Sequence, residues 1–271
     1  MKKVFSWAFA AALICGLNVF TSCSTDDNPV KPTDNLAEKI IGKWIFAERN
    51  GEPTPTNKKR VFNIVSETKA YVSASRGAEP TMAMKWLDHT EADVVINGNK
   101  MTLTMQADEH TTVEDEFIII NIDDTEFTAN LKVSVTVDGT KEKVSENILC
   151  LKKLARDYSE TILGTWEGHV TNSEGSEYDD GKVHRWEYKA DGTYVYYSLD
   201  EAGEWVSSEN DLNEYFVDGT LLCTRWIDND EEFREWWEIA YLKGDKMQWK
   251  ALRQKEDGST FTATFEMKKV Q

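Results

Sequence analysis

Cysteine is scarce in this sequence, with four residues in 271 positions. Cys15 and Cys23 lie within or at the end of an apolar N-terminal stretch, which leaves Cys150 and Cys223 for the rest of the chain. There is no Cys-x-x-Cys pair, and none of the four histidines has a partner at metal-ligand spacing, so we expect no metal site. Cys150 and Cys223 fit two buried thiols, or one bridge between two domains in an oxidising compartment.

Positively charged residues are also few. The sequence has 31 Lys and Arg residues and 48 Asp and Glu residues, which gives a net charge of −17. Nucleic-acid binding depends on Lys and Arg that neutralise phosphates, so a nucleic-acid partner is not expected. Direct adhesion to an anionic membrane surface is disfavoured for the same reason. An acidic surface fits a soluble, self-repelling protein, or a face selected for a cationic partner.

The usual signatures of catalysis are missing. The chain contains no Gly-x-Ser-x-Gly, phosphate-binding loop or nucleotide fingerprint. Residues 228–232 (DNDEE) place oxygen ligands at alternate positions, but Phe233 stands where a calcium loop requires glycine. We therefore expect an acidic hairpin turn there, no cofactor, and a protein that is not an enzyme.

The N-terminus has the pattern of a secretory signal. Lys2 and Lys3 precede a stretch, residues 4–20, that is apolar apart from three positions, and small residues follow it. Residues 1–22 are therefore predicted to be a signal peptide that lies outside the folded protein. The stretch is also about the minimum length for a membrane-spanning helix, although no second basic flank follows it.

Residues 19–23 (VFTSC) resemble the lipobox of bacterial lipoproteins, with Phe20 where an aliphatic residue is usual. The resemblance implies cleavage before Cys23 and acylation of that residue, and two or more acyl chains anchor a protein stably to a bilayer. Residues 24–29 (STDDNP) resemble acidic signals that send lipoproteins to the outer face of the outer membrane. Residues 23–35 are then a flexible tether, and the protein is expected on the exterior of a bacterial outer membrane.

A short motif occurs twice in the remaining chain. Residues 41–44 (IGKW) return as residues 163–166 (LGTW), and each copy opens a block of alternating apolar and polar residues. A repeat with so long a period predicts two copies of one domain. We place the copies at residues 36–154 and 158–271.

Each copy consists of short alternating runs joined by Asn-Gly or Asp-Gly turns, as at residues 97–98 and 218–219. No helix is long enough for a crossover connection, so the sheets must be antiparallel meanders. A meander of about eight strands closes most simply into an up-and-down barrel, which removes its edges. A short helical turn precedes each barrel, and Asp34 or Asn35 is the expected cap of the first.

The Gly-x-Trp at each barrel entry and the ladder of hairpins after it resemble the lipocalin-like domains of bacterial lipoproteins. This resemblance implies an all-β protein with two tandem antiparallel, lipocalin-like β-barrels. Trp44 and Trp166 are expected to close the barrel floors. Other lipocalin segments are not evident, so the resemblance carries over no ligand.

Seven of the ten tryptophans lie in the second copy. Trp186, Trp226 and Trp249 fall on neighbouring predicted strands and can line a cavity with Tyr196, or simply fill the core. Trp236 and Trp237 are adjacent and point to opposite faces of one strand, so at least one of them faces solvent, the other domain or a partner.

Two functions fit these features. The first is a lipid-anchored binding protein whose second barrel holds a small apolar molecule or a glycan against Trp186, Tyr196, Trp226 and Trp249. The alternative is an accessory subunit that docks on an outer-membrane assembly through an aromatic patch at Trp236 and Trp237.

Overall fold

The structure is a computed structural model that describes residues 35–74, 86–172, 181–208, 210, 212–255 and 257–270. The predicted signal peptide, Cys23 and nearly all of the tether lie outside the described residues. The described residues all belong to one compact unit. In the part of the chain that the structure describes, no helix is long and apolar enough to cross a membrane.

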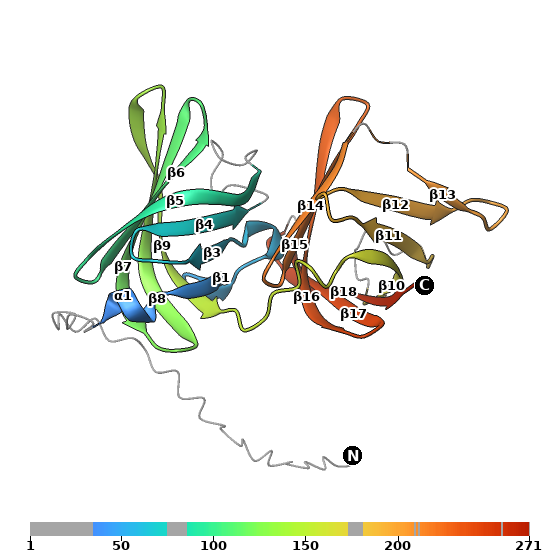
Figure 1. Ribbon diagram of the computed structural model, residues 1–271, viewed down its shortest axis with the longest axis horizontal. Helices are drawn as coiled ribbons and strands as arrows, with labels where there is room; N and C mark the ends of the chain where they lie inside the picture. Colours follow the sequence, from blue (N-terminus) through green and yellow to red (C-terminus); the bar gives the residue numbers. More distant parts are fainter. Residues whose placement is uncertain are drawn as a thin grey trace, which may run out of the picture. The chain divides into compact units, whose positions relative to one another are not determined.

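The first copy forms a nine-stranded antiparallel meander (Figure 1). A short helix, α1 (Leu36–Lys39), precedes it, and the 3-10 turn η1 (Thr56–Lys58) interrupts it. Its strands are β1 (Gly42–Arg49), β2 (Glu52–Pro53), β3 (Val61–Ile64), β4 (Lys69–Ala74), β5 (Leu87–Asn97), β6 (Lys100–Asp108), β7 (Thr111–Ile122), β8 (Glu126–Val137) and β9 (Thr140–Lys153).

The first sheet closes into a barrel because β1 pairs with both β3 and β9. In these pairings Trp44 stands opposite Phe62 on one side and Lys153 on the other. The predicted glycine turns lie between paired strands, and Gly98 has a positive φ of 62°. The all-β, up-and-down architecture predicted from the sequence is confirmed.

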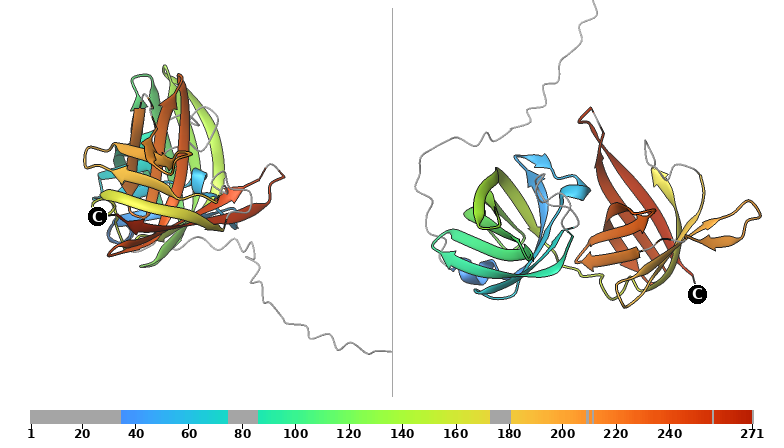
Figure 2. Two further views of the ribbon diagram at one scale, coloured as in Figure 1. Left: turned by 90° about the vertical axis from the view of Figure 1, so that its right-hand side faces the viewer. Right: turned by 90° about the horizontal axis from the view of Figure 1, so that it is seen from above.

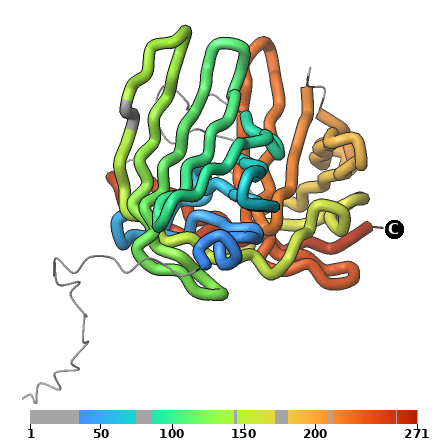
Figure 3. Tube along the Cα trace, turned by 60° about the vertical axis from the view of Figure 1, so that its left-hand side comes forward, coloured from blue at the N-terminus to red at the C-terminus, as the bar shows by residue number. Residues whose placement is uncertain are grey.

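The second copy forms another nine-stranded antiparallel sheet, in the order β13-β12-β11-β10-β18-β17-β16-β15-β14. The continuous tube in Figure 3 lets the reader follow both meanders. The strands of the second sheet are β10 (Gly164–Asn172), β11 (His184–Tyr188), β12 (Tyr194–Leu199), β13 (Trp205–Ser207), β14 (Leu212–Asp218), β15 (Leu221–Asp228), β16 (Glu231–Lys243), β17 (Lys246–Gln254) and β18 (Thr260–Lys269).

The second barrel differs from a fully closed one at a seam between β12 and β14. Among the described residues, one isolated bridge, Thr193 to Glu214, joins these strands, and the Tyr215 amide donates to the Gly192 carbonyl at 2.8 Å. The β12–β13 hairpin extends away from the rest of the sheet (Figure 2). The second sheet is therefore a barrel with one open seam.

Trp44 and Trp166 lie at equivalent places at the entries of the two sheets. Both are fully buried, and their indole nitrogens donate to the carbonyls of Ile40 and Ile162 at 2.7 and 2.6 Å. The ammonium of Lys153 lies 5.1 Å from the centre of the Trp44 ring, and a lysine near the C-terminus lies 5.3 Å from that of Trp166. The repeated motif thus reproduces one packing arrangement, in which each indole meets a cation from the last strand of its sheet.

The glycine of this motif is required by the backbone. Gly42 and Gly164 have φ values of 137° and 107°, which disfavour any residue with a Cβ. A Cβ on Gly164 would also lie 2.9 Å from Cε of Lys269. The helical turn before each motif is α1 in the first copy and a single Ile162-to-Tyr158 hydrogen bond in the second. Asn35, one of the two predicted caps, occupies the N-cap position, but its backbone is left-handed and its side chain makes no capping hydrogen bond; Asp34 lies outside the described residues.

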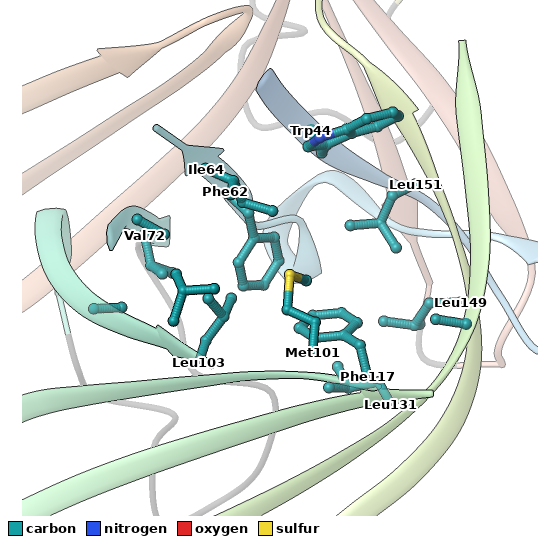
Figure 4. Close-up of a cluster of buried hydrophobic side chains, with 14 of the residues drawn as sticks. Trp44, Phe62, Ile64, Val72, Met101, Leu103, Phe117, Leu131, Leu149 and Leu151 are labelled. Atoms are coloured by element: carbon teal, nitrogen blue, oxygen red, sulfur yellow. The ribbon is translucent and has the colours of Figure 1, made fainter. Parts of the chain in front are cut away.

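Apolar side chains fill the interior of the first barrel, as Figure 4 shows for the cluster around Phe62, Met101 and Phe117. One ion pair is buried in this barrel as well: Arg60 and Asp115 are 1% and 0% exposed and approach to 3.0 Å. Burial raises the pKa of Asp115, and the charge of Arg60 opposes that rise. Arg60 Nη2 and Asp115 Oδ1 have no hydrogen-bond partner in the structure, so each ion depends heavily on the other.

Side chains of the two sheets also contact each other. Ile45 and Val61 of the first sheet share an apolar cluster with Phe216, Leu221 and Cys223 of the second.

Beside this apolar cluster, the fully buried carboxylate of Asp218 meets Lys43 Nζ at 2.5 Å and accepts a hydrogen bond from Ser73 Oγ at 2.6 Å. His89 Nε2 lies 3.8 Å from the same carboxylate, and its Nδ1 lies 2.5 Å from Asp88. A charge of the second sheet is thus neutralised by groups of the first.

We expect Asp115→Asn to destabilise the protein by about 3–5 kcal/mol, because it leaves Arg60 buried without a counter-ion. Urea unfolding followed by circular dichroism measures the change. The control is Glu114→Gln, on the same strand as Asp115, which breaks a partly exposed ion pair with Lys141 of β9 and should cost less than about 1 kcal/mol. Equal losses for the two variants would contradict the role assigned to the buried pair.

His89 gives a pH-dependent prediction. The hydrogen bond to Asp88 raises the pKa of His89 above 6.5, burial opposes this, Asp218 adds to it, and Lys43 counteracts it. A histidine with a raised pKa in the folded state stabilises the protein fully below pH 6.5, and this contribution is lost as the pH rises through the folded-state pKa.

The free energy of unfolding should therefore differ more between wild type and His89→Asn at pH 6 than at pH 9. Asparagine is chosen because His89 has a φ of 47°, which asparagine tolerates. His110→Asn, at an exposed histidine, is the control. A difference that is the same at both pH values would exclude a charged His89 from the contact between the sheets.

Candidate functional site

The second barrel contains a cavity of about 280 Å³. Five strands and the connection between β13 and β14 contribute its lining. Seven aromatic side chains form most of the wall: Trp186, Tyr188, Tyr194, Tyr196, Trp226, Trp237 and Trp249. Four polar residues complete it: Ser208, Asn210, Thr224 and Glu235.

The alternation of each strand explains why these residues converge. On β11 the buried positions are His184, Trp186 and Tyr188, two residues apart, so that all three face the interior. On the other side of the cavity, Thr224 of β15 stands opposite Glu235 of β16. Because alternate residues of a strand point to the same face, each strand contributes every second side chain to the interior of the barrel.

Six of the seven aromatic side chains are linked to one another by ring contacts, whereas Trp226 stacks on Phe233. The Trp186 ring lies 5.3 Å from Tyr196 and 5.1 Å from Trp249, and Trp249 lies 5.8 Å from Trp237. These spacings are within the range of favourable aromatic pairs, which prefer tilted or offset rings. His184 helps to fix the position of Tyr196, because its Nδ1 lies 2.6 Å from the Tyr196 hydroxyl. These contacts preorganise the aromatic rings in the absence of a ligand.

The charge of Glu235 is balanced within the barrel. Glu235 is 6% exposed and forms an ion pair with Arg253, whose guanidinium lies 4.8 Å from the centre of the Trp237 ring. Burial raises the pKa of Tyr194, a hydrogen bond with Thr224 opposes that rise, and the charge of Glu235 adds to it. The phenol of Tyr194 therefore stays neutral at physiological pH.

Two donors at the cavity wall lack partners. The Tyr188 hydroxyl and the Trp249 indole nitrogen are buried and have no hydrogen-bond partner in the structure. Burial raises the pKa of Tyr188 well above 10, so that this group also remains a neutral donor. A buried donor without an acceptor costs about 1–3 kcal/mol, which an acceptor entering the cavity floor would relieve.

The cavity lies at the open seam of the barrel. Its wall is drawn from β11 and β12 on one side and from β15, β16 and β17 on the other. Near the seam, the Ser208 amide donates to the Tyr196 carbonyl at 2.9 Å, and the Asn210 amide nitrogen donates to the Asn213 side chain at the same distance. The seam therefore brings polar side chains to the edge of an aromatic cavity.

All four residues that the sequence singled out for ligand binding, namely Trp186, Tyr196, Trp226 and Trp249, line this one cavity. Sequence reasoning missed Tyr188 and Tyr194, although each is two residues from a chosen aromatic on the same strand. It also missed Glu235, because acidic residues are too frequent in this chain for one to stand out.

Trp236 and Trp237 do face opposite sides of β16, but they do not form an exposed patch. Trp237 is 2% exposed and lines the cavity. Trp236 is partly buried and packs on the apolar cluster between the two sheets. Trp236 thus faces the other sheet, which is one of the outcomes expected for this pair, whereas Trp237 faces the cavity.

Two further features of the described residues bear on metal binding and on disulfide formation. There, no group of three or more His, Cys, Asp or Glu side chains could hold a metal ion. Cys150 is partly buried on the first sheet and Cys223 fully buried on the second, and the structure contains no disulfide between these described cysteines.

Comparison with known proteins gives a limited result. No family model matches the chain, and no curated protein matches it. Among solved structures, a single mutant of the vaccine antigen transferrin-binding protein B from Haemophilus parasuis is 10% identical, with a TM-score of 0.22, over 79% of this chain and 61% of that protein. A double mutant of the same antigen is 8% identical, with a TM-score of 0.23, over 82% and 62%. This chain therefore spans less than two thirds of those proteins, and likeness at this level assigns it no function.

Proposed function

We propose that this protein is a binding protein whose second barrel holds a small, ring-containing ligand in the aromatic cavity. The observation that carries the proposal is the convergence of seven aromatic and four polar side chains on about 280 Å³ at an open seam. Ligand sites are typically concave, lined mainly by apolar and aromatic groups, and supplied with a few placed polar groups. The volume is near the lower end of the usual ~300–1,000 Å³, which suits a small ligand.

Ligand binding should also require little loss of conformational entropy from the side chains of the wall. Tryptophan and tyrosine have few rotatable bonds, and here their rings already pack on one another. A ligand then loses little affinity to the ordering of side chains. Each favourable ring pair contributes about 0.5–1.5 kcal/mol beyond the area it buries.

The N-terminal sequence supports a lipid-anchored setting for this binding. We propose that residues 1–22 are removed, that Cys23 is acylated, and that residues 23–35 tether the barrels to the outer membrane, facing the exterior. The first barrel, at residues 36–154, has a filled interior and is proposed as the support for the second, at residues 158–271. The alternative of an accessory subunit loses its main argument, because Trp237 lines the cavity and Trp236 packs between the sheets.

We expect Trp226→Ala to weaken the binding of a ring-containing probe at least tenfold, since about 1.4 kcal/mol of lost stacking gives that factor. Saturation-transfer NMR on the full chain measures binding of indole, methyl glycosides, phenyltrimethylammonium and benzoate. Trp205→Ala is the matched control, because Trp205 packs under Arg185 and does not line this cavity. Absence of binding by every probe would refute the proposed function.

The anchor is tested separately in cells of a lipoprotein-exporting bacterium. Cys23→Ala should abolish incorporation of labelled palmitate and shift the protein out of the outer-membrane fraction. Cys15→Ala, which lies inside the predicted signal peptide, should leave both properties unchanged. Retention of Cys23→Ala in the membrane would indicate an uncleaved leader helix instead.

A further inference from the structure

We infer that the ligand of this cavity is a neutral, polyhydroxylated ring, that is, a saccharide unit. This inference rests on the proposed function and narrows it from a ring-containing ligand to one chemical class. Three properties of the wall lead to it: the kind of apolar surface, the balance of charge, and the placement of polar groups.

The first property is the kind of apolar surface. Among the described residues that line the cavity, every large apolar group is the ring of a tryptophan or tyrosine, and no aliphatic side chain takes part. Aromatic faces carry negative potential. They therefore favour the slightly positive C–H hydrogens on one face of a sugar ring. An acyl chain would find none of the aliphatic contacts that fill the first barrel.

The second property is the charge. Glu235 is the one charged side chain among the described lining residues, and its partner Arg253 already neutralises it. An anionic ligand would bring a second negative charge to a buried carboxylate, which is costly. A cationic ligand would have to displace Arg253 or lie beside its guanidinium. A neutral ligand leaves the ion pair in place and can use it as a hydrogen-bonding surface.

The third property is the set of polar groups that line the cavity together with the aromatic rings. Thr224 and Glu235 stand side by side on β15 and β16, and Ser208 and Asn210 lie at the seam. Hydroxyl, amide and carboxylate groups together offer both donors and acceptors. An apolar ring would cover them without making hydrogen bonds, and sites built with polar groups reject such ligands strongly. The hydroxyls of a sugar can meet these groups while its C–H face lies on the tryptophans.

The volume and the seam also limit how much of a saccharide can enter. About 280 Å³ suits a small unit rather than a long chain inside the barrel. Because the sheet is open between β12 and β14, a substituent on that unit can pass outward at the seam. The site thus fits a single sugar or the terminal unit of a glycan.

The test uses the full chain and four neutral probes: the methyl glycosides of glucose, galactose and mannose, and N-acetylglucosamine. Phenyltrimethylammonium, benzoate and indole represent cationic, anionic and apolar ligands that contain a ring. Saturation-transfer NMR should show contact with the C–H protons of at least one sugar, and tryptophan fluorescence should report its titration.

Asn210→Ala should weaken the binding of that sugar at least tenfold, because it removes a side-chain amide at the rim of the cavity without creating a void in the core. Asn130→Ala, at an exposed asparagine of the first barrel that bonds Glu146, is the matched control and should leave the affinity unchanged. Glu235→Gln gives a second test and should also weaken the binding of the sugar at least tenfold. Circular dichroism checks that this variant is folded.

Binding of phenyltrimethylammonium, benzoate or indole without any sugar would overturn the assignment to saccharides and leave the proposed binding function standing. Sugar binding that neither Asn210→Ala nor Glu235→Gln weakens would also overturn it, because the sugar would then lie elsewhere. Binding of no probe at all would overturn both the inference and the proposed function.

Discussion

The packing of Trp249 against its neighbours is the interaction on which the second barrel depends. Its ring lies between 5.1 and 6.3 Å from those of Trp186, Trp237, Phe265 and Tyr188. These rings come from β11, β16 and β18 as well as from β17, so one buried indole connects four strands. The same cluster forms the floor of the cavity, which means that the stability of the barrel and the shape of its site rest on the same contacts.

The two barrels begin with the same structural motif but differ in the side chains of their interiors. Each begins with a left-handed glycine and a buried tryptophan that a lysine of the last strand covers. The first barrel then closes its ladder and fills with apolar side chains and one buried ion pair. The second carries large rings at the corresponding inward positions and leaves its ladder open at a seam. The first sheet therefore encloses an apolar core with one buried ion pair, whereas the second encloses a cavity lined by aromatic rings.

Contacts between the sheets combine an apolar cluster with a buried charge. Asp218 is fully buried, and such a carboxylate is tolerated only where opposite charge and hydrogen bonds compensate it. Lys43 and Ser73 of the first sheet provide that compensation. Lys43 is the middle residue of the Gly-x-Trp motif in the first copy, where the second copy has Thr165, so this segment also contributes to the contact with the second sheet.

The sequence by itself determined the strand periodicity, the positions of the glycine turns and the repeat, because these depend on local backbone preferences and on alternation along a single strand. It therefore predicted the all-β meanders and the equivalent burial of Trp44 and Trp166, and it selected four aromatic residues that share one cavity. The tertiary structure alone decided that one barrel is open, that Trp237 faces the cavity, and that Glu235 pairs with Arg253. These features depend on how strands distant in the chain approach each other and on the volumes that meet between them, which no local pattern records.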